Sequence, residues 1–450
     1  MSAPRTTPWP LVALFAAGYL APYLLPTTVG RLGSGLHLSA TQAGAIGSAL
    51  LLSSASAGFL LASRVDRFGA RPLARCGLLL AAVGYGSAAL TGWVPAVLAG
   101  ALVGGFGSGT MTAVAASGIA AQRDPHRVTT YGLLGVSALA GALYLTIPHL
   151  GPGHGQPLAA IALTALAVWP LTDRLPARTV AVRGTLRGGR PPRMRSGLLL
   201  AAAMPCWSLA QNALWGVSGR IGGVQAHLTE VTVGVVFAVA LGAGLLGVVG
   251  AGALGSRLGR AVPIGAGTVL IAGCIALSAS AHGLPAFAAG EVAWNLLYPV
   301  VLSYVIGLAA ALDPRGRWAV LVGSASSLGT AAGPLTGSAL ASAAGFPVMG
   351  RVLAVGLLAV AVPLTAVALR AGDRRTAVAV VELALDTPTV PVPDAFDTAS
   401  AELRSASPVR ENPEPVAPEV VALRLDAPAV PVRADYETAA PNSYASTSAR

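Results

Sequence analysis

Residues Ser63–Pro72 read SRVDRFGARP and place three arginines and one aspartate within ten positions. More than 30 residues without a charged side chain precede this segment, and another apolar run follows it. A short charged segment between two long apolar runs is typical of a loop that connects two membrane-spanning helices. The rest of the chain repeats this alternation, so the fold can be inferred from it.

The composition supports a membrane protein. Only 10% of the residues are charged, and the mean hydropathy is +0.68, whereas a soluble domain carries about 25% charged residues. Runs of about 20 apolar residues, the length that crosses a bilayer, recur twelve times. They lie at about residues 9–29, 40–63, 73–92, 94–121, 129–149, 156–172, 196–218, 231–254, 263–281, 284–311, 318–344 and 347–369. The sequence therefore predicts an all-α integral membrane protein with twelve transmembrane helices.

The arginines predict the orientation of these helices. All 29 basic residues are arginines. If the N-terminus is cytoplasmic, 21 of the first 24 arginines fall on cytoplasmic segments, and only Arg31, Arg220 and Arg351 fall on the other side. Basic residues concentrate on the cytoplasmic side of membrane proteins. We therefore expect a multi-pass protein of the bacterial inner (plasma) membrane with both termini in the cytoplasm. The net charge of +11 then reflects topology and contact with lipid rather than binding of nucleic acid.

The charge pattern also divides the chain. The arginine-rich segment 173–195 separates an N-terminal six-helix half, residues 1–172, from a C-terminal six-helix half, residues 196–372. The acidic, proline-rich residues 373–450 contain no run long enough to span a membrane, which predicts a disordered cytoplasmic tail. Within the tail, segments 380–400 and 420–440 agree at 11 of 21 positions. The repeat is either neutral or a short motif, within residues 380–440, that binds a protein partner.

The charged loop has a counterpart in the second half. Asp66-Arg67-Phe68-Gly69 is matched 190 residues later by Ser256-Arg257-Leu258-Gly259. Two six-helix halves that both carry this loop, with an arginine-rich segment between them, resemble the major facilitator superfamily. The loop motif of that family is approximately Gly-x-Leu-x-Asp-Arg-x-Gly-Arg-Arg. The first half matches it at Asp66, Arg67, Gly69 and Arg71, and the second at Gly252, Leu254, Arg257, Gly259 and Arg260.

The resemblance implies a secondary transporter in which the two halves rock around a site near the middle of the membrane. It also implies that Asp66 faces the start of the eleventh helix near Trp318, so that the loop acts as a cytoplasmic latch. Gly69 permits a tight turn with positive φ, and Arg67 and Arg71 can pair with Asp66. The alternative is ordinary positive-inside charge, which requires arginine but neither the aspartate nor the glycine.

One carboxyl group lies within the membrane region. Glu291 is about seven residues into the tenth apolar run, and Asn295 follows it by one helical turn. Ionisable groups in membrane helices are costly to bury and usually face a cavity or a partner. We therefore predict that Glu291 and Asn295 belong to a proton or substrate pathway. The alternative is a glutamate near the outer interface that pairs with Arg220.

Five further side chains are candidates for the same pathway. Gln211, Asn212 and Trp215 lie close together in the seventh run, where amides either line a cavity or join helices. Tyr19 and Tyr23 lie one turn apart in the first run, and anchoring at the membrane interface is the alternative.

The eleventh run contains Gly329, Gly333, Pro334 and Gly337. Small residues every four positions allow close helix packing, and Gly333-Pro334 predicts a bend. The drug–proton antiporters of the family carry such a bend in the fifth helix and an arginine in the fourth. The fifth run here has no Gly-Pro pair, and Val103 takes the arginine position, which argues against that specific assignment.

No catalytic or metal-binding pattern stands out. Gly104–Gly109 is glycine-rich but lies inside an apolar run without a preceding strand, unlike a nucleotide-binding loop. The three cysteines are far apart. We expect no enzyme activity, no cofactor, no metal site, and a protein that acts as a monomer. Proton-coupled efflux of a small molecule is the first expectation. Uptake, or a membrane sensor or scaffold that signals through the tail, are the alternatives.

Overall fold

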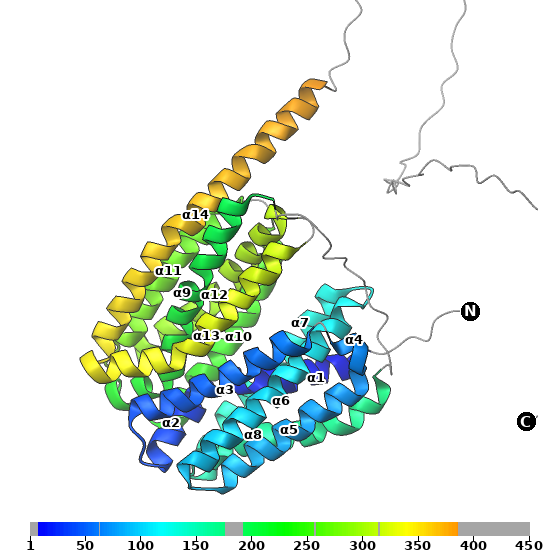
Figure 1. The fold of residues 1–450 in the computed structure, drawn as a ribbon. Helices are drawn as coiled ribbons and strands as arrows, with labels where there is room; N and C mark the ends of the chain where they lie inside the picture. The colour runs from blue at the N-terminus through cyan, green and yellow to red at the C-terminus, as the bar shows by residue number, and fades with distance from the viewer. Residues whose placement is uncertain (1–7, 63, 176–191, 256–257, 314–315, 386–450) are drawn as a thin grey trace, which may run out of the picture. The chain divides into compact units, whose positions relative to one another are not determined.

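The computed structural model describes residues 8–62, 64–175, 192–255, 258–313 and 316–385, and for Asp66 and residues 372–385 it describes the backbone only. Residues Met1–Thr387 form one compact unit, and the described part of this unit is helical apart from short connections (Figure 1). Most of the arginine-rich segment, all of Ser256-Arg257 and most of the repeated tail lie outside the described residues.

The helices of the first half are α1 (Trp9–Tyr23), α2 (Leu25–Gly35), α3 (Ala40–Leu61), α4 (Val65–Phe68), α5 (Ala70–Leu90), α6 (Val94–Ala120), α7 (Pro125–Thr146) and α8 (Gly155–Val168). Those of the second half are α9 (Met194–Arg220), α10 (Glu230–Leu254), α11 (Ala261–Ala279), α12 (Leu284–Leu312), α13 (Arg317–Ala344) and α14 (Phe346–Leu385). Short turns η1 (Ile147–Leu150), η2 (Trp169–Arg174) and η3 (Ile221–Gln225) follow α7, α8 and α9.

The twelve predicted spans correspond to these helices. In the described residues, ten helices are long and apolar enough to cross a membrane, and α1 with α2, bent by 48°, can form an eleventh span. Helix α13 has 28 residues but is less apolar, because Gly, Ser and Thr occupy many of its positions. Helix α14 continues to Leu385, beyond the expected boundary at residue 372. The prediction of an all-α membrane fold is confirmed.

Small residues explain the close packing of α13 against α9. A Cβ atom added at Gly329 would overlap the backbone of Pro205, and one at Gly337 would overlap the backbone of Ala213. A Cβ at Gly333 would meet Asn212 in the same way. Removing the side chain at every fourth position lets two backbones approach closely within lipid. The predicted packing role of this glycine series is confirmed. Pro334 lies inside α13, while the bend that it predicts stays a prediction.

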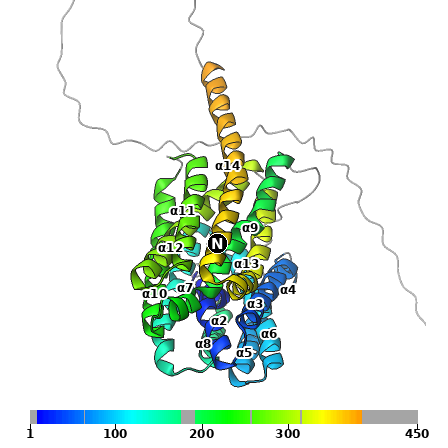
Figure 2. The ribbon, with the colours of Figure 1, turned by 90° about the vertical axis from the view of Figure 1, so that its left-hand side faces the viewer.

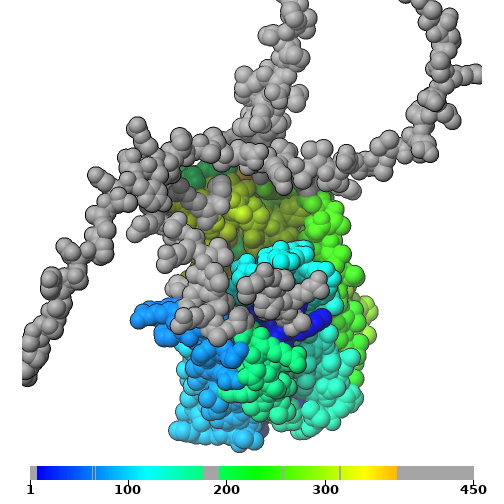
Figure 3. Space-filling view, turned by 90° about the vertical axis from the view of Figure 1, so that its right-hand side faces the viewer, coloured from blue at the N-terminus to red at the C-terminus, as the bar shows by residue number. Residues whose placement is uncertain are grey.

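The contacts between the halves repeat under a shift of six spans. Helix α3, the second span, packs against α13, the eleventh, and α7, the fifth, packs against α10, the eighth. Adding six to one partner and subtracting six from the other converts the first pair into the second, as expected for two halves related by a pseudo-two-fold axis. Figure 2 shows α3 beside α13 and α10 beside α7. Both halves also reach the surface in Figure 3, the first in blue to cyan and the second in green to yellow.

The hydrogen bonds between the halves lie toward one end of the unit. We call the end at which α5, α7, α9 and α13 begin the arginine-rich end, and the end at which α3, α10, α12 and α14 begin the opposite end. Among the described residues, three hydrogen bonds join the halves, and all lie in the part of the unit nearer the opposite end. They are Arg31 to Glu230, Trp215 to the carbonyl of Pro22, and the amide of Leu335 to Ser48.

Candidate functional site

The side chain of Glu291 is fully buried inside the second half. Its Oε1 atom accepts hydrogen bonds from Ser218 Oγ of α9 and Ser278 Oγ of α11, both at 2.7 Å. Its Oε2 atom has no hydrogen-bond partner among the described residues. Buried charges in proteins are normally paired. An oxygen without a partner, in a carboxyl group that pairs with no basic side chain of the described residues, is therefore best accommodated in the neutral form.

A glycine brings the helices of this site together. Gly290 precedes Glu291 on α12, and a Cβ atom there would lie 2.8 Å from the backbone nitrogen of Ser278. Because Gly290 has no side chain, α11 can approach α12 closely enough for Ser278 to reach the carboxyl group. The partners of Glu291 are thus set by helix packing.

Asn295 and Arg220 do not bind the carboxyl group. The Asn295 amide donates to the backbone carbonyl of Glu291 at 3.0 Å, so it shares the helix face but bonds to its own helix. The Arg220 guanidinium lies 5.5 Å from the centroid of the Phe346 ring. Among the described residues no ion pair joins Arg220 to Glu291. The alternative in which Glu291 pairs with Arg220 is therefore not what the structure shows.

Aromatic side chains form a continuous series beside Glu291. Trp215 lies 5.5 Å from Trp294 between ring centroids, and Trp294 lies 6.0 Å from Tyr298. Tyr298 stacks on Trp207 at 5.4 Å. On the other side, Trp215 meets Phe237 at 5.2 Å. These residues come from α9, α10 and α12, so three helices of the second half share one aromatic surface.

The predicted polar residues of α9 have different surroundings. The Gln211 Oε1 atom accepts from Trp294 Nε1 at 2.9 Å, which attaches it to the aromatic series. Asn212 instead donates to Ser208 of its own helix at 2.9 Å and to Thr330 of α13 at 3.3 Å. Its contacts join helices, which was one of the two predicted roles. The structure brings Gln211 and Trp215 together with Trp294 and leaves Asn212 on the α13 side.

The two tyrosines of α1 complete the site from the first half. Tyr19 is 39% exposed, although its neighbours from Pro10 to Gly18 and Leu20 are nearly all buried. The Tyr23 carbonyl accepts from the Tyr144 hydroxyl at 2.6 Å. The Tyr144 ring in turn lies 5.0 Å from the ring of Phe237 of α10, measured between centroids. The site is therefore built from both halves.

Sequence reasoning missed the strongest contact between the halves. Arg31 of α2 is only 3% exposed, and its Nη2 atom donates to Glu230 Oε2 at 2.7 Å. The same guanidinium donates to carbonyls of the α7–α8 connection: Gly151 at 2.6 Å, Gly153 at 3.3 Å and Ile147 at 3.2 Å. It also donates to Gln156 at 2.8 Å. The signal available in the sequence was a lone arginine on the side with few arginines.

The charged loop at the arginine-rich end shows the expected backbone. Gly69 has φ = +87° and Gly259 has φ = +64°, conformations that favour glycine over residues with a Cβ atom. Arg71 donates to the carbonyls of Asp173 at 2.6 Å and Leu175 at 2.9 Å. This arginine therefore holds the end of the sixth span.

The remaining parts of the predicted latch are only partly visible. The side chain of Asp66 and all of Arg257 lie outside the described residues. Arg67 is exposed, and Arg260 is the residue before α11. Trp318 of α13 is 2% exposed and donates to the carbonyl of Pro192 at 2.8 Å. The proposed contact between Asp66 and the start of α13 stays a prediction.

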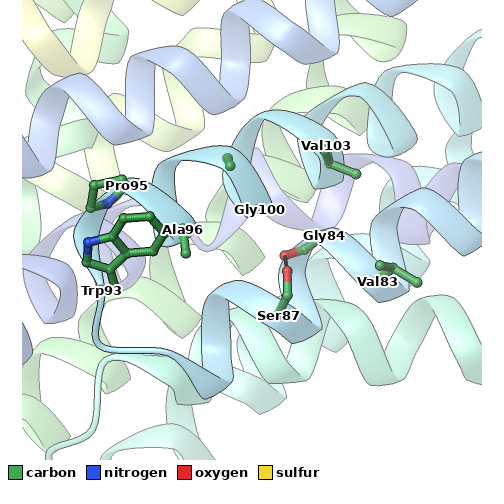
Figure 4. Close-up of a pocket in the computed structure, with 9 residues that line it drawn as sticks. Val83, Gly84, Ser87, Trp93, Pro95, Ala96, Gly100 and Val103 are labelled. Carbon is green, nitrogen blue, oxygen red and sulfur yellow. Dashed lines mark hydrogen bonds between the residues drawn. The ribbon is translucent and has the colours of Figure 1, made fainter.

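A groove of about 460 Å³ opens between α5 and α6 on the first half (Figure 4). Trp93, Pro95 and Val103 contribute to its walls, and Ser87 is one of its few polar side chains. The Ser87 hydroxyl donates to the carbonyl of Gly84 at 2.9 Å. With its polar group already bonded, the groove offers an apolar surface and no chemical group for catalysis.

The comparisons with known proteins agree with this geometry. The Major Facilitator Superfamily profile matches residues 11–153. Solved transporters superimpose on most of the chain. Residues 11–153 are therefore similar to the Major Facilitator Superfamily. Among these structures are the human organic anion transporter MFSD10, the POT family transporter PepTSo, and the nucleoside transporter NupG.

Similarity to these facilitator structures lies in the fold more than in the sequence. MFSD10 is 19% identical, with a TM-score of 0.60 over 81% of this chain and 100% of its own. PepTSo is 12% identical, with a TM-score of 0.64 over 82% and 99%. NupG is 12% identical, with a TM-score of 0.63 over 80% and 99%. None of the curated protein sequences matches this chain significantly.

Proposed function

We propose that this chain is a proton-coupled secondary transporter that moves a small organic molecule out of the cytoplasm across a bacterial inner membrane. The observation that carries the coupling is the carboxyl group of Glu291, buried with two serine hydroxyls and no cation. Such a group can take up and release a proton, but it is costly to charge while it is buried. Coupling of proton movement to substrate movement requires the free energy of charging Glu291 to change as the halves move.

The contacts between the halves supply that change. Glu291 bonds to Ser218 on α9, and three residues before it Trp215 donates to Pro22 of the first half at 3.0 Å. A movement of the halves that breaks the Trp215 contact also displaces α9, the helix that carries Ser218. Protonation of Glu291 and the position of the first half are therefore linked through one helix.

Alternating access follows from the same arrangement. The three hydrogen bonds that join the halves among the described residues lie nearer the opposite end, and the excess of arginines supports a cytoplasmic position for the arginine-rich end. A transporter held together at its outer end offers its site to the cytoplasm. Export begins from that state, and the ion pair between Arg31 and Glu230 must then break when the opposite end opens.

The decisive experiment compares Glu291→Gln with the parent protein in liposomes. Proton-driven flux is measured for a panel that includes an organic anion, a nucleoside and a peptide, because the similar solved structures include an organic anion transporter, a nucleoside transporter and a POT family peptide transporter. We expect Glu291→Gln to abolish proton-driven flux while exchange of substrate without a proton gradient persists. Asp124→Asn, at the exposed start of α7, serves as the matched control and should leave flux unchanged. Unchanged proton-driven flux in Glu291→Gln would falsify the proposed coupling.

Two alternatives have their own tests. Uptake predicts flux in the reverse direction in the same oriented vesicles. A sensor or scaffold that signals through the tail predicts that removal of residues 386–450 abolishes its output. A transporter keeps its flux after that deletion, because the cut falls after the last residue of α14.

A further inference from the structure

The aromatic residues of this chain are concentrated at one place. The sequence contains 7 Trp, 9 Tyr and 8 Phe, and seven of these side chains form one chain of ring contacts, which we call the aromatic seam. Its members are Tyr144, Trp207, Trp215, Phe237, Phe287, Trp294 and Tyr298, with centroid distances of 5.0 to 6.1 Å between neighbours. Only 5% of the residues are aromatic, and Leu, Val and Ala fill most of the core elsewhere. Filling the core therefore does not require this grouping of rings.

One part of the seam remains accessible. Phe237 and Trp207 are fully buried, whereas Tyr298 is half-buried. Tyr19, 39% exposed, and the half-buried Tyr23 lie one turn apart on α1, and the Tyr23 carbonyl accepts from the hydroxyl of the seam member Tyr144. Partly accessible tyrosines of both halves therefore lie at the seam or within one helical turn of a residue bonded to it. An aromatic ring favours a planar partner stacked on it or meeting it edge to face.

The seam offers no ionised partner to a solute. None of its members carries a charge, and the nearest carboxyl group, Glu291, is occupied by two serine hydroxyls. In the described part of the membrane unit, Arg127 and Arg220 lie at the ends of helices, and Arg31 is paired with Glu230. An ionic solute would lose its hydration here without a counter-charge. The attraction of a cation to a ring is too weak to replace the lost hydration.

Two hydrogen-bond donors in the seam region have no acceptor. Gln211 Nε2 and Trp207 Nε1 are buried and without a partner among the described residues. Gln211 is bonded to Trp294, and Trp207 is stacked on Tyr298. A buried donor without an acceptor destabilises the fold. Both side chains are fully buried in this conformation, so a solute that carries a carbonyl oxygen recovers part of that cost in a conformation that opens the seam.

We propose that the transported substrate is an uncharged, planar aromatic compound that carries a hydrogen-bond acceptor and stacks on Tyr298 and Tyr19. This inference rests on the proposed transport function and deepens it. The aromatic faces select planarity, the lack of an ionised partner selects a neutral solute, and the donors Gln211 and Trp207 select the acceptor.

The test uses four probes and the full-length protein in lipid nanodiscs. 1-Naphthamide is planar, neutral and carries a carbonyl. 1-Naphthoate adds a negative charge, 1-naphthyltrimethylammonium adds a positive charge, and decalin-1-carboxamide removes planarity. Binding is measured by quenching of tryptophan fluorescence for the naphthalene probes and by equilibrium dialysis for all four, with empty nanodiscs subtracted for partition into lipid. We expect saturable binding of naphthamide and at least tenfold weaker binding of the other three.

Variants locate the binding. Tyr298→Leu should weaken naphthamide binding about three- to tenfold, which corresponds to loss of one ring contact, and Tyr298→Phe should retain it. Phe59→Leu removes an exposed ring of α3 outside the seam and should have no effect. If Tyr298→Leu reduces the amount of folded protein, naphthamide binding by Tyr19→Leu tests the same site. Equal or tighter binding of a charged or non-planar probe, absence of saturable naphthamide binding, or full binding by Tyr298→Leu and Tyr19→Leu would each overturn the inference.

Failure of the inference is distinguishable from failure of the transport proposal. Proton-driven flux of another solute without naphthamide binding leaves transport standing and removes the substrate class. Saturable naphthamide binding without flux in liposomes, with or without a proton gradient, retains the binding site and removes transport.

Discussion

The two ends of the membrane unit use their charges differently. At the arginine-rich end, Arg71 and Arg75 bind the turn after the sixth span, and Arg317 pairs with Asp313 one helical turn before it at 2.7 Å. Among the described side chains these bonds stay within one half. At the opposite end, Arg31 crosses from the first half to Glu230 of the second.

The difference shows that the number of charges and the function of charges are separate properties. Basic residues concentrated on one side of a membrane protein orient its helices during insertion, whereas a bond within one half does not oppose separation of the halves. At the opposite end, Arg31 is held by four acceptors of its own half. It therefore presents a fixed donor to Glu230, and this ion pair can keep the opposite end closed.

Of the substitutions that test this difference between the two ends, replacing Arg31 should have the largest effect on stability and flux. Arg31→Leu leaves four acceptors of the first half and Glu230 without their donor. Loss of one member of a buried, hydrogen-bonded charge pair costs about 3 to 5 kcal/mol, and the exposed side of Glu230 places the expected loss at the lower end. Thermal unfolding in detergent should shift downward, and proton-driven flux should fall at least tenfold. Arg351→Leu, an exposed arginine of α14, is the control and should change neither.

Closing the space at Gly44 should separate the halves at the opposite end. A Cβ atom there would lie 2.6 Å from the carbonyl oxygen of Pro334 on α13, and overpacking of this kind costs about 1 to 3 kcal/mol. With spin labels at Ser34 and Val231, Gly44→Ala should move the distance distribution toward longer distances. Gly58→Ala, on the same helix with no atom within 4 Å of the added carbon, should leave it unchanged. An unchanged distribution in Gly44→Ala would mean that the added carbon is accommodated without separating the halves, and would contradict the prediction.

Neutralising Glu230 should have a smaller effect. Its side chain is 62% exposed, so the ion pair is screened on one side and contributes about 1 kcal/mol or less. Glu230→Gln should raise the population with longer Ser34–Val231 distances by at most about fivefold, and 0.5 M salt should reduce the difference from the parent protein. Equal distance distributions at low salt would show that the ion pair does not hold this end closed.

The smallest expected effect is that of Asp66→Asn at the arginine-rich end. If Asp66 faces the first turn of α13, its interaction with the helix dipole is worth about 0.3 to 1 kcal/mol. Transport should slow about two- to fivefold while the amount of protein in the membrane stays the same. A tenfold or greater loss of flux would reverse the comparison and make the arginine-rich end the stronger latch. The control is Arg123→Gln, which removes an exposed charge at the same end but outside the loop and should leave transport unchanged.

Much of the candidate site followed from the sequence, but the contacts did not. Glu291, Gln211, Trp215, Tyr19 and Tyr23 were predicted from their residue types inside apolar runs. Their assembly depends on partners on other helices, among them Ser218 and Ser278, which are ordinary residues in membrane helices. Helical spacing places Asn295 on the face of Glu291, yet it cannot tell that the amide bonds to the backbone of its own helix.

The sequence by itself determined the class of fold. The length of an apolar run decides whether a segment can span a bilayer, and the distribution of arginines favours one orientation; both are local properties of the sequence. It also determined the repeat of the loop around Gly69 and Gly259 and the close packing of α13. The tertiary structure alone decided that Arg31 meets Glu230, 199 residues away in the chain, and that aromatic residues from four helices meet in one seam. Within lipid, helices associate through shape and a few hydrogen bonds, and these depend on the rotation and depth of each helix, which the order of residues along one helix does not specify.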